Sequence, residues 1–150
     1  RPLTGGGYQA FEPSAFLTYA PEPLNFHDAH SIYFEVLGEH GFVGLFLFLS
    51  LGVLAWRAGT YCIKRARRGE AEPWLGNLAA MLQVTLIGYA TGGAFLGLAY
   101  FDLFYHIVAI LVLLRSMATS NETVTKSADS IQSQLARPAP EIEKEHMFHR

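Results

Sequence analysis

The chain has 150 residues, of which 51% are hydrophobic, 13% are aromatic and 16% are charged, with a formal net charge of -2 at pH 7. This composition is too apolar and too poor in charge for an average soluble domain, and it predicts an all-α integral membrane protein. The basic residues do not alternate with aromatic ones as a single-strand binding groove requires, so no nucleic-acid partner is expected. The single Cys62 excludes an internal disulfide and is interpreted as a packing residue.

Residues 1–28 are predicted to form an extramembrane loop. Three consecutive glycines at 5–7 and prolines at 13, 21 and 23 prevent a long helix there. The chain starts at Arg1 without Met or a signal-like segment, and its first residues have the composition of a loop. We therefore expect a C-terminal part of a longer protein, in which 1–28 is the end of a larger loop.

Residues 29–63 are predicted to form one helix that begins outside the membrane and continues into the first of three transmembrane helices. Asp28 is suited to cap this helix at Ala29, which would place His30 in the first turn. No proline interrupts the chain between these residues and Pro73. The uncharged stretch 41–56 reaches spanning length if the side chain of Arg57 extends to the interface.

Residues 74–118 are predicted to form a transmembrane helical hairpin, because they hold enough apolar residues for two spans, with an outer turn between Gly92 and Asp102. The basic loop 64–73 would lie in the cytoplasm by the positive-inside rule, so that residues 1–40 face the opposite side. Residues 119–150 are polar and almost without apolar periodicity. They are predicted to be a disordered cytoplasmic tail.

His30 is the first candidate for chemistry. Free backbone N–H groups and the helix dipole at a helix start favour an anion such as phosphate by about 0.3–2 kcal/mol. A charged imidazole there would bind a phosphate oxygen, and a neutral one would accept a proton from an attacking hydroxyl. The alternative is that His30 only caps or packs an interfacial helix.

Three further residues carry charge or titrate on the same side. Arg1 is the sole Lys or Arg within residues 1–56, and a guanidinium binds phosphate bidentately, although a solvated loop residue is an equal alternative. Asp102 and His106 are four residues apart and can meet on one helix face near the outer end of the third span. They would take part in function or hold helices together.

Other titratable residues are interpreted more simply. His27, Asp28 and His30 resemble a cluster of metal ligands, but no second cluster accompanies them, so no metal site is expected. Glu35 and Glu39 lie one helical turn apart and are interpreted as a solvated face. If they faced the bundle instead, they could supply a base.

A histidine followed by serine, nine residues and Gly-x-x-Gly resembles the histidine motif of the O-antigen ligase and polymerase superfamily. Here the motif reads His30-Ser31, nine residues, then Gly41-Phe42-Val43-Gly44. Residues 1–8 and 28–41 are most similar to the O-glycosylation ligase branch associated with exosortase A systems. The likeness covers residues 1–117.

The resemblance implies a multi-pass glycosyltransferase of the bacterial inner membrane, active on the periplasmic side and independent of metal ions and other cofactors. Such a ligase takes a glycan from undecaprenyl diphosphate and joins it to a hydroxyl of a protein or lipid acceptor. The resemblance implies that His30 is catalytic and that Arg1 binds the diphosphate; Ser31, Asp28, Asp102 and His106 are candidates for supporting roles. The remaining family helices are not in this sequence, so the isolated segment is expected to be inactive.

Two alternatives stay open at this point. One is an O-antigen-type polymerase that extends the lipid-linked glycan, which the sequence does not distinguish from a ligase. The other is a membrane transporter or structural segment, in which Asp102 and His106 would relay protons or ions. A transporter should show paired broken helices at mid-membrane, whereas here the candidate residues gather at the outer rim, which favours a reaction on a lipid head group.

Overall fold

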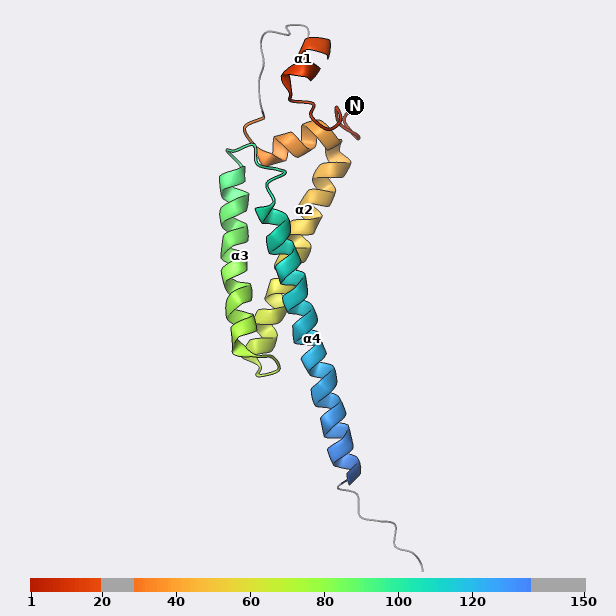
Figure 1. Ribbon diagram of the computed structural model, residues 1–150, viewed down its shortest axis with the longest axis vertical. Coiled ribbons are helices and arrows are strands. Elements are labelled where there is room, and N and C mark those ends of the chain that lie inside the picture. The colour runs from red at the N-terminus through yellow and green to blue at the C-terminus, as the bar shows by residue number, and fades with distance from the viewer. Residues whose placement is uncertain (20–28, 136–150) are drawn as a thin grey trace, which may run out of the picture.

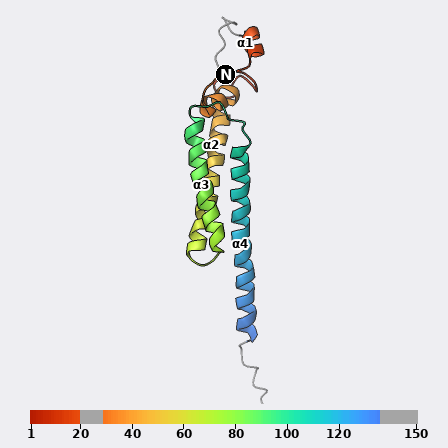
Figure 2. The same cartoon turned by 60° about the vertical axis from the view of Figure 1, so that its left-hand side comes forward.

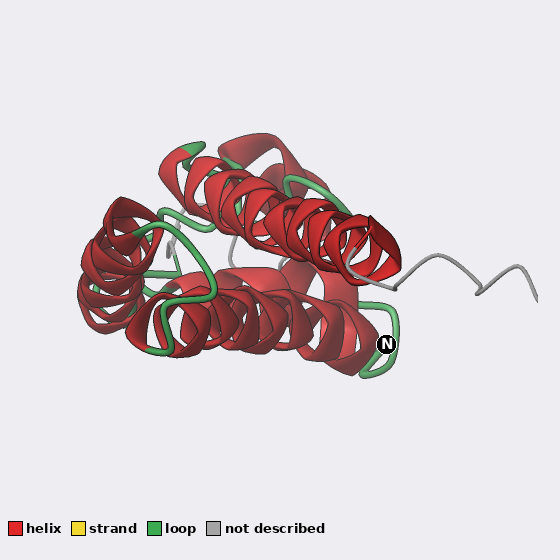
Figure 3. Ribbon diagram, turned by 90° about the horizontal axis from the view of Figure 1, so that it is seen from below, coloured by secondary structure: helices red, strands yellow, loops and turns green. Residues whose placement is uncertain are grey.

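The computed structural model describes residues 1–19 and 29–135. Four helices follow one another in this part of the chain: α1 (Pro13–Tyr19), α2 (Ile32–Arg67), α3 (Pro73–Gly93) and α4 (Leu103–Leu135). α2 and α3 lie side by side, and α4 packs against both and continues past their lower ends (Figures 1 and 2). Seen from below, the described residues form helices and loops without strands, which confirms the predicted all-α class (Figure 3).

Two helices of the described part are long and apolar enough to span a membrane, namely α2 and the Leu103–Ser120 part of α4. Within the most apolar 18-residue stretch of each helix, only 17% of α2 and 28% of α4 is buried inside the protein, so most of these side chains face outwards. α3 has 21 residues, but Asn77 and Gln83 lower its mean hydropathy. The span predicted over α3, the second of the three in chain order, therefore stays a prediction.

Small residues let α2 and α3 approach closely. Ala58 and Cys62 of α2 are buried at this interface together with Ala79 of α3, in agreement with the interpretation of Cys62 as a packing residue. A Cβ on Gly76 would lie 2.6 Å from the Cβ of Ala66. Larger side chains of α4 complete the core, with Phe104, Ile107, Leu111 and Leu114 buried. Helices that have no hydrophobic driving force for association often pack through small residues, which let their backbones come close together.

α2 is broken at Gly41, where the backbone has φ 65° and ψ -166°. This conformation is accessible essentially only to glycine. The first segment, residues 32–40, lies across the upper end of the bundle, and the second segment, residues 42–67, runs down it (Figure 1). The prediction of an uninterrupted helix was wrong, because it considered proline as the helix breaker and the break here is made by glycine.

The N-terminal loop closes this break. Four hydrogen bonds join the loop to the two segments: Gly6 N to Gly38 O at 2.7 Å, Gly7 N to Glu39 O at 3.0 Å, Phe42 N to Pro2 O at 3.0 Å and Val43 N to Leu3 O at 3.4 Å. A broken helix leaves backbone groups without intrahelical partners, and the loop supplies them. A Cβ on Gly5 would overlap the backbone of Glu39, so Gly5 is explained by close contact with the helix, whereas Gly7 adopts a positive φ of 101° with open space around it.

The Gly-x-x-Gly pair has two different structural reasons. Gly41 provides the unusual backbone conformation, and a Cβ there would also overlap the backbone of Leu3. Gly44 makes room for a neighbour, because a Cβ there would overlap the Cβ of His40. The two glycines of the motif therefore allow the chain to bend and leave space for the His40 side chain.

The start of α2 differs from the prediction. The helix begins at Ile32 rather than Ala29, and its N-cap is Ser31, which has an extended backbone and makes no side-chain capping bond among the described residues. His30 therefore precedes the helix instead of lying in its first turn. Asp28, the predicted cap, lies outside the described residues.

Two other boundaries also change. α2 continues through Arg67, so the connection to α3 comprises only residues 68–72 of the predicted basic loop 64–73. α4 continues to Leu135, so residues 119–135 are helical where a disordered tail was predicted from 119. No Gly or Pro lies between Leu103 and Leu135, and extending an existing helix is far easier than starting one. Residues 136–150 lie outside the described part.

Gly41→Ala tests the break. We expect the substitution to destabilise the fold by about 1–3 kcal/mol, because alanine is strained in this conformation, and the overlap with Leu3 adds to the cost. Gly52→Ala in the same helix is the matched control, since a Cβ there would meet only Phe104 at an ordinary 4.0 Å. Thermal unfolding of the purified proteins measures the difference, and equal unfolding temperatures for the two variants would contradict the assignment.

Candidate functional site

The candidate residues gather at the upper end of the bundle, where the first segment of α2, the N-terminal loop and the α3–α4 connection meet (Figure 1). The lower end is different in charge. Lys64, Arg67 and Arg68 are exposed there at the end of α2. The two ends of the molecule therefore offer different chemistry, and the titratable cluster lies away from the basic one.

Glu39 is the buried acid of this site, with only 5% of its surface exposed. Its Oε2 accepts a hydrogen bond from the hydroxyl of Tyr100, which lies in the α3–α4 connection. The interpretation of Glu39 as part of a solvated face is thereby corrected. The physical reason is the bend at Gly41, which turns the first segment of α2 across the bundle so that one of its faces covers the α3–α4 connection.

Glu35 lies one turn earlier and is partly buried. Its Oε2 accepts a hydrogen bond of 3.2 Å from the backbone N–H of Ala99. The hydroxyl of Tyr33 donates to the carbonyl of Ala90 at the end of α3, at 2.9 Å. Side chains of the first segment thus bind it to α3 and to the α3–α4 connection, which holds its direction.

His40 lies beside the Glu39–Tyr100 pair but is exposed. Its Nδ1 is 3.3 Å from the Tyr100 hydroxyl oxygen and 4.0 Å from Oε2 of Glu39. The ring of Tyr8 packs edge-on against Tyr100, with 5.7 Å between the centroids. A carboxylate, a phenol and an imidazole therefore meet at the bend, supported by three separate segments of the chain.

Burial raises the pKa of Tyr100 well above its usual value, and the hydrogen bond to Glu39 raises it further. Both effects disfavour the phenolate, the first because a buried charge loses hydration and the second because a carboxylate cannot donate to it. Tyr100 is consequently neutral at physiological pH and keeps its proton as a hydrogen-bond donor.

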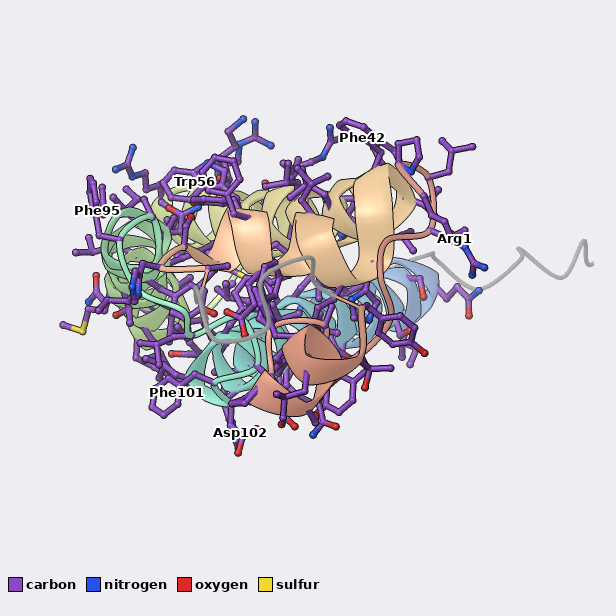
Figure 4. The ribbon with its side chains drawn as sticks, turned by 90° about the horizontal axis from the view of Figure 1, so that it is seen from above. Arg1, Phe42, Trp56, Phe95, Phe101 and Asp102 are labelled. Carbon is purple, nitrogen blue, oxygen red and sulfur yellow. The ribbon has the colours of Figure 1, made fainter. Side chains whose placement is uncertain are left out.

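His30 and Arg1 lie at opposite ends of the first segment of α2. His30 is exposed just before the helix start, whereas Arg1 lies beside the bend, because the next residue, Pro2, binds the N–H of Phe42 (Figures 1 and 4). With a rise of about 1.5 Å per residue, segment 32–40 is about 13 Å long. The structure does not bring the two predicted residues together.

The other predicted supporting residues have local roles. Ser31 is buried, with 5% exposed, as the N-cap of α2. Nδ1 of His106 is 2.7 Å from the backbone carbonyl of Asp102 and not from its carboxylate. The side chain of Asp102 points outwards, on the side of the bundle opposite Trp56 (Figure 4). The expected pair of Asp102 and His106 side chains is therefore not formed, because Asp102 precedes α4 instead of sharing its face.

Within the described residues, no group of three or more His, Cys, Asp or Glu side chains is arranged to hold a metal ion. His27 and Asp28, two of the three residues considered as metal ligands, lie outside that part. An apolar groove of about 250 Å³ runs between α2 and α3. Ile32 and Tyr33 line its upper end, and Phe104 of α4 contributes to its wall.

Comparison of the chain with protein-family models, with curated proteins and with solved structures found no match. The functional interpretation therefore depends on the residues themselves.

The group of Glu39, His40 and Tyr100 was missed from the sequence. Tyr100 is 60 residues away from His40 in the sequence. No local spacing links the two segments. The one sequence signal is the adjacency of Glu39 and His40 to Gly41, the first glycine of the motif.

Tyr100→Phe tests the importance of the buried bond. We expect it to destabilise the fold by about 1–3 kcal/mol, because the Glu39 carboxylate loses a donor while it stays buried. Tyr105→Phe is the matched control, since the Tyr105 ring packs edge-on against Phe104 and phenylalanine preserves that contact. Thermal unfolding measures both, and a neutral Tyr100→Phe would contradict the interpretation.

The same bond predicts a dependence on alkaline pH. The pKa of Tyr100 is higher in the folded than in the unfolded state, so the folded state holds the proton more tightly. This stabilisation is complete below the unfolded value of about 10 and is lost as the pH rises above it. We expect the difference in unfolding temperature between the native protein and Tyr100→Phe to shrink above pH about 10; a constant difference would exclude this coupling.

Proposed function

We propose that this chain is part of a membrane glycosyltransferase that transfers a glycan from undecaprenyl diphosphate to a hydroxyl of a protein or lipid acceptor. The observation that carries the proposal is the position of His30, exposed directly before an apolar helix that is long enough to span a membrane. This is the histidine of the His-Ser, Gly-x-x-Gly pattern that resembles the O-antigen ligase and polymerase superfamily. The first glycine of the motif, Gly41, bends the helix at the other end of this first segment, so the pattern has a structural basis.

The outside of the bundle supports a membrane location. All three long helices carry large apolar side chains that are each more than half exposed. These are Phe42, Phe46, Leu47, Val53 and Leu54 on α2, Met81, Val84 and Ile87 on α3, and Val112 and Leu113 on α4. Figure 4 shows Phe42 and Trp56 pointing away from the bundle. Soluble proteins rarely expose so large an apolar surface, whereas lipid chains solvate it. This exposure supports α3 as a transmembrane helix despite the amide side chains of Asn77 and Gln83.

The charges support an orientation. Lys64, Arg67 and Arg68 lie at the lower end, and Arg115 of α4 reaches the same level, with its guanidinium carbon 5.4 Å from the ring centre of Tyr61. Short basic segments stay in the cytoplasm. The upper end, with His30, then faces the periplasm, where a lipid-linked glycan is presented to its acceptor.

The proposed reaction is a direct displacement at the anomeric carbon. A diphosphate is a good leaving group, so the enzyme needs mainly to neutralise its charge and to position the acceptor hydroxyl. The free N–H groups at the start of α2 attract the diphosphate, and His30 beside them orients or deprotonates the acceptor. Arg1 lies beside the bend, at the other end of a first segment that is about 13 Å long. If Arg1 binds the diphosphate, it therefore binds a different phosphate from the one at the helix start.

His30→Ala tests this function. In the full-length protein we expect glycan transfer to be abolished while membrane insertion and the amount of protein are unchanged, because His30 is exposed and supports no packing. His149→Ala, in the polar C-terminal segment, controls for the loss of a histidine. The readout is glycan that leaves the lipid carrier for the acceptor; longer lipid-linked chains would indicate the polymerase, and unchanged transfer would remove His30 from the mechanism.

Single cysteines test the orientation. Cys62 is fully buried, and its replacement by alanine gives a background without thiols. In this background Phe34→Cys places a thiol at a position that is 68% exposed in the first segment, and Arg68→Cys places one at the basic end. A membrane-impermeant maleimide should label the first in spheroplasts and the second only after the membrane is opened. The reverse pattern would exclude a periplasmic site.

A further inference from the structure

The first segment of α2 carries one histidine before its start and another at its end, in opposite electrostatic surroundings. His30 lies at the start, where the helix dipole and free N–H groups favour negative charge. His40 is the last residue before the bend at Gly41, where the dipole favours positive charge, and it lies beside the buried Glu39 carboxylate. The two ends are therefore suited to different parts of one reaction.

The hydrogen bonds around Tyr100 determine which nitrogen of His40 is free. A phenol has one proton, and Tyr100 donates it to Oε2 of Glu39. The contact of 3.3 Å between the Tyr100 oxygen and Nδ1 of His40 can then be a hydrogen bond only if Nδ1–H is the donor. In the neutral ring Nε2 consequently carries the lone pair. The His40 side chain is 47% exposed, so the ring can be reached from solvent.

The surroundings also restrict the orientation of the ring. Glu39 is buried, and its carbonyl accepts the N–H of Gly7 from the N-terminal loop. Tyr100 is packed against Tyr8. The Cβ of His40 lies over Gly44, where a side chain would not fit. An imidazole held through its Nδ1–H by a chain that ends in a carboxylate has the arrangement of a general base.

We infer that His40, oriented by Tyr100 and Glu39, removes the proton from the acceptor hydroxyl in place of His30, and that the His30 end of the segment binds the diphosphate; this inference rests on the proposed function. The acceptor O–H proton passes to Nε2 of His40 as the acceptor oxygen bonds to the anomeric carbon. The bond from that carbon to the phosphate oxygen breaks, and its electron pair leaves with undecaprenyl diphosphate. Glu39, through Tyr100, stabilises the positive charge that forms on His40.

The separation of the two ends is compatible with such a displacement. The attacking oxygen and the leaving oxygen lie on opposite sides of the anomeric carbon, so the base and the groups that bind the leaving group must lie apart. Inverting glycosidases place their two carboxyl groups about 6.5–9.5 Å apart. In those enzymes the acid protonates a single leaving-group oxygen, whereas a diphosphate leaving group is larger and needs a greater distance between the base and the groups that bind it. The first segment of α2, about 13 Å long, provides this distance.

Nitrogen-15 NMR of histidine in the full-length protein, in lipid nanodiscs, tests the orientation without any need for activity. We expect the signals lost in His40→Gln to belong to a neutral ring protonated on Nδ1, and Tyr100→Phe to change this into a mixture of tautomers. Glu39→Gln can still accept from Tyr100 and should preserve the tautomer, which controls for general disturbance of the site. A ring protonated on Nε2 in the native protein would overturn the inference.

Transfer kinetics test the role, with the lipid-linked glycans and acceptors of cells that carry the protein. His40→Gln should lower kcat by about 10²–10⁴-fold, the usual contribution of a general base, with little change in KM for the donor. Glu39→Gln and Tyr100→Phe should lower kcat in the same direction, whereas His30→Gln should raise KM for the donor. Tyr105→Phe is the control with native rates.

The outcomes separate the two proposals. If the native protein transfers glycan and His40→Gln does so at the native rate, the role of His40 is excluded and the glycosyltransferase proposal stands. If the native protein transfers no glycan, the proposed function fails and the role of His40 in it fails as well. A large loss of kcat in His40→Gln together with the Nδ1–H tautomer supports both.

Discussion

The bend of α2 at Gly41 is the constraint on which the rest of the site depends. A helix broken in this way leaves carbonyl and N–H groups without partners, and residues 1–7 supply them through four backbone hydrogen bonds. The glycines at Gly5 and Gly41 allow this because both contacts are between backbones, with no space for a Cβ. The bend, the loop and the glycine motif are therefore one structural unit.

Because the bend turns the first segment of α2 across the bundle, its side chains meet the α3–α4 connection. Glu35 and Glu39 bind Ala99 and Tyr100, and Ile32 packs against Gly93, where a Cβ would lie 2.5 Å from its Cδ1. These contacts join residues that lie about 60 positions apart in the chain. A straight helix would leave the same carboxylates in solvent, without these partners.

The proposed chemistry follows from this placement. A histidine precedes the start of the first segment and another lies at its end, so the helix dipole acts on the two in opposite directions. Only His40 has a hydrogen-bonded chain to a buried carboxylate, through Tyr100. A reaction that must bind an anionic leaving group on one side and accept a proton on the other matches these two ends better than either histidine alone.

The sequence by itself determined the helical class, the apolar length of α2 and α4 and the basic end after residue 63. These features are local, since composition, apolar length and charge runs act through neighbouring residues. The tertiary structure decided that the helix bends, that Glu39 is buried, that His40 and Tyr100 meet and that Arg1 is distant from His30. The reason is that one glycine with positive φ redirects a whole segment, and the partners of that segment lie far away in the sequence.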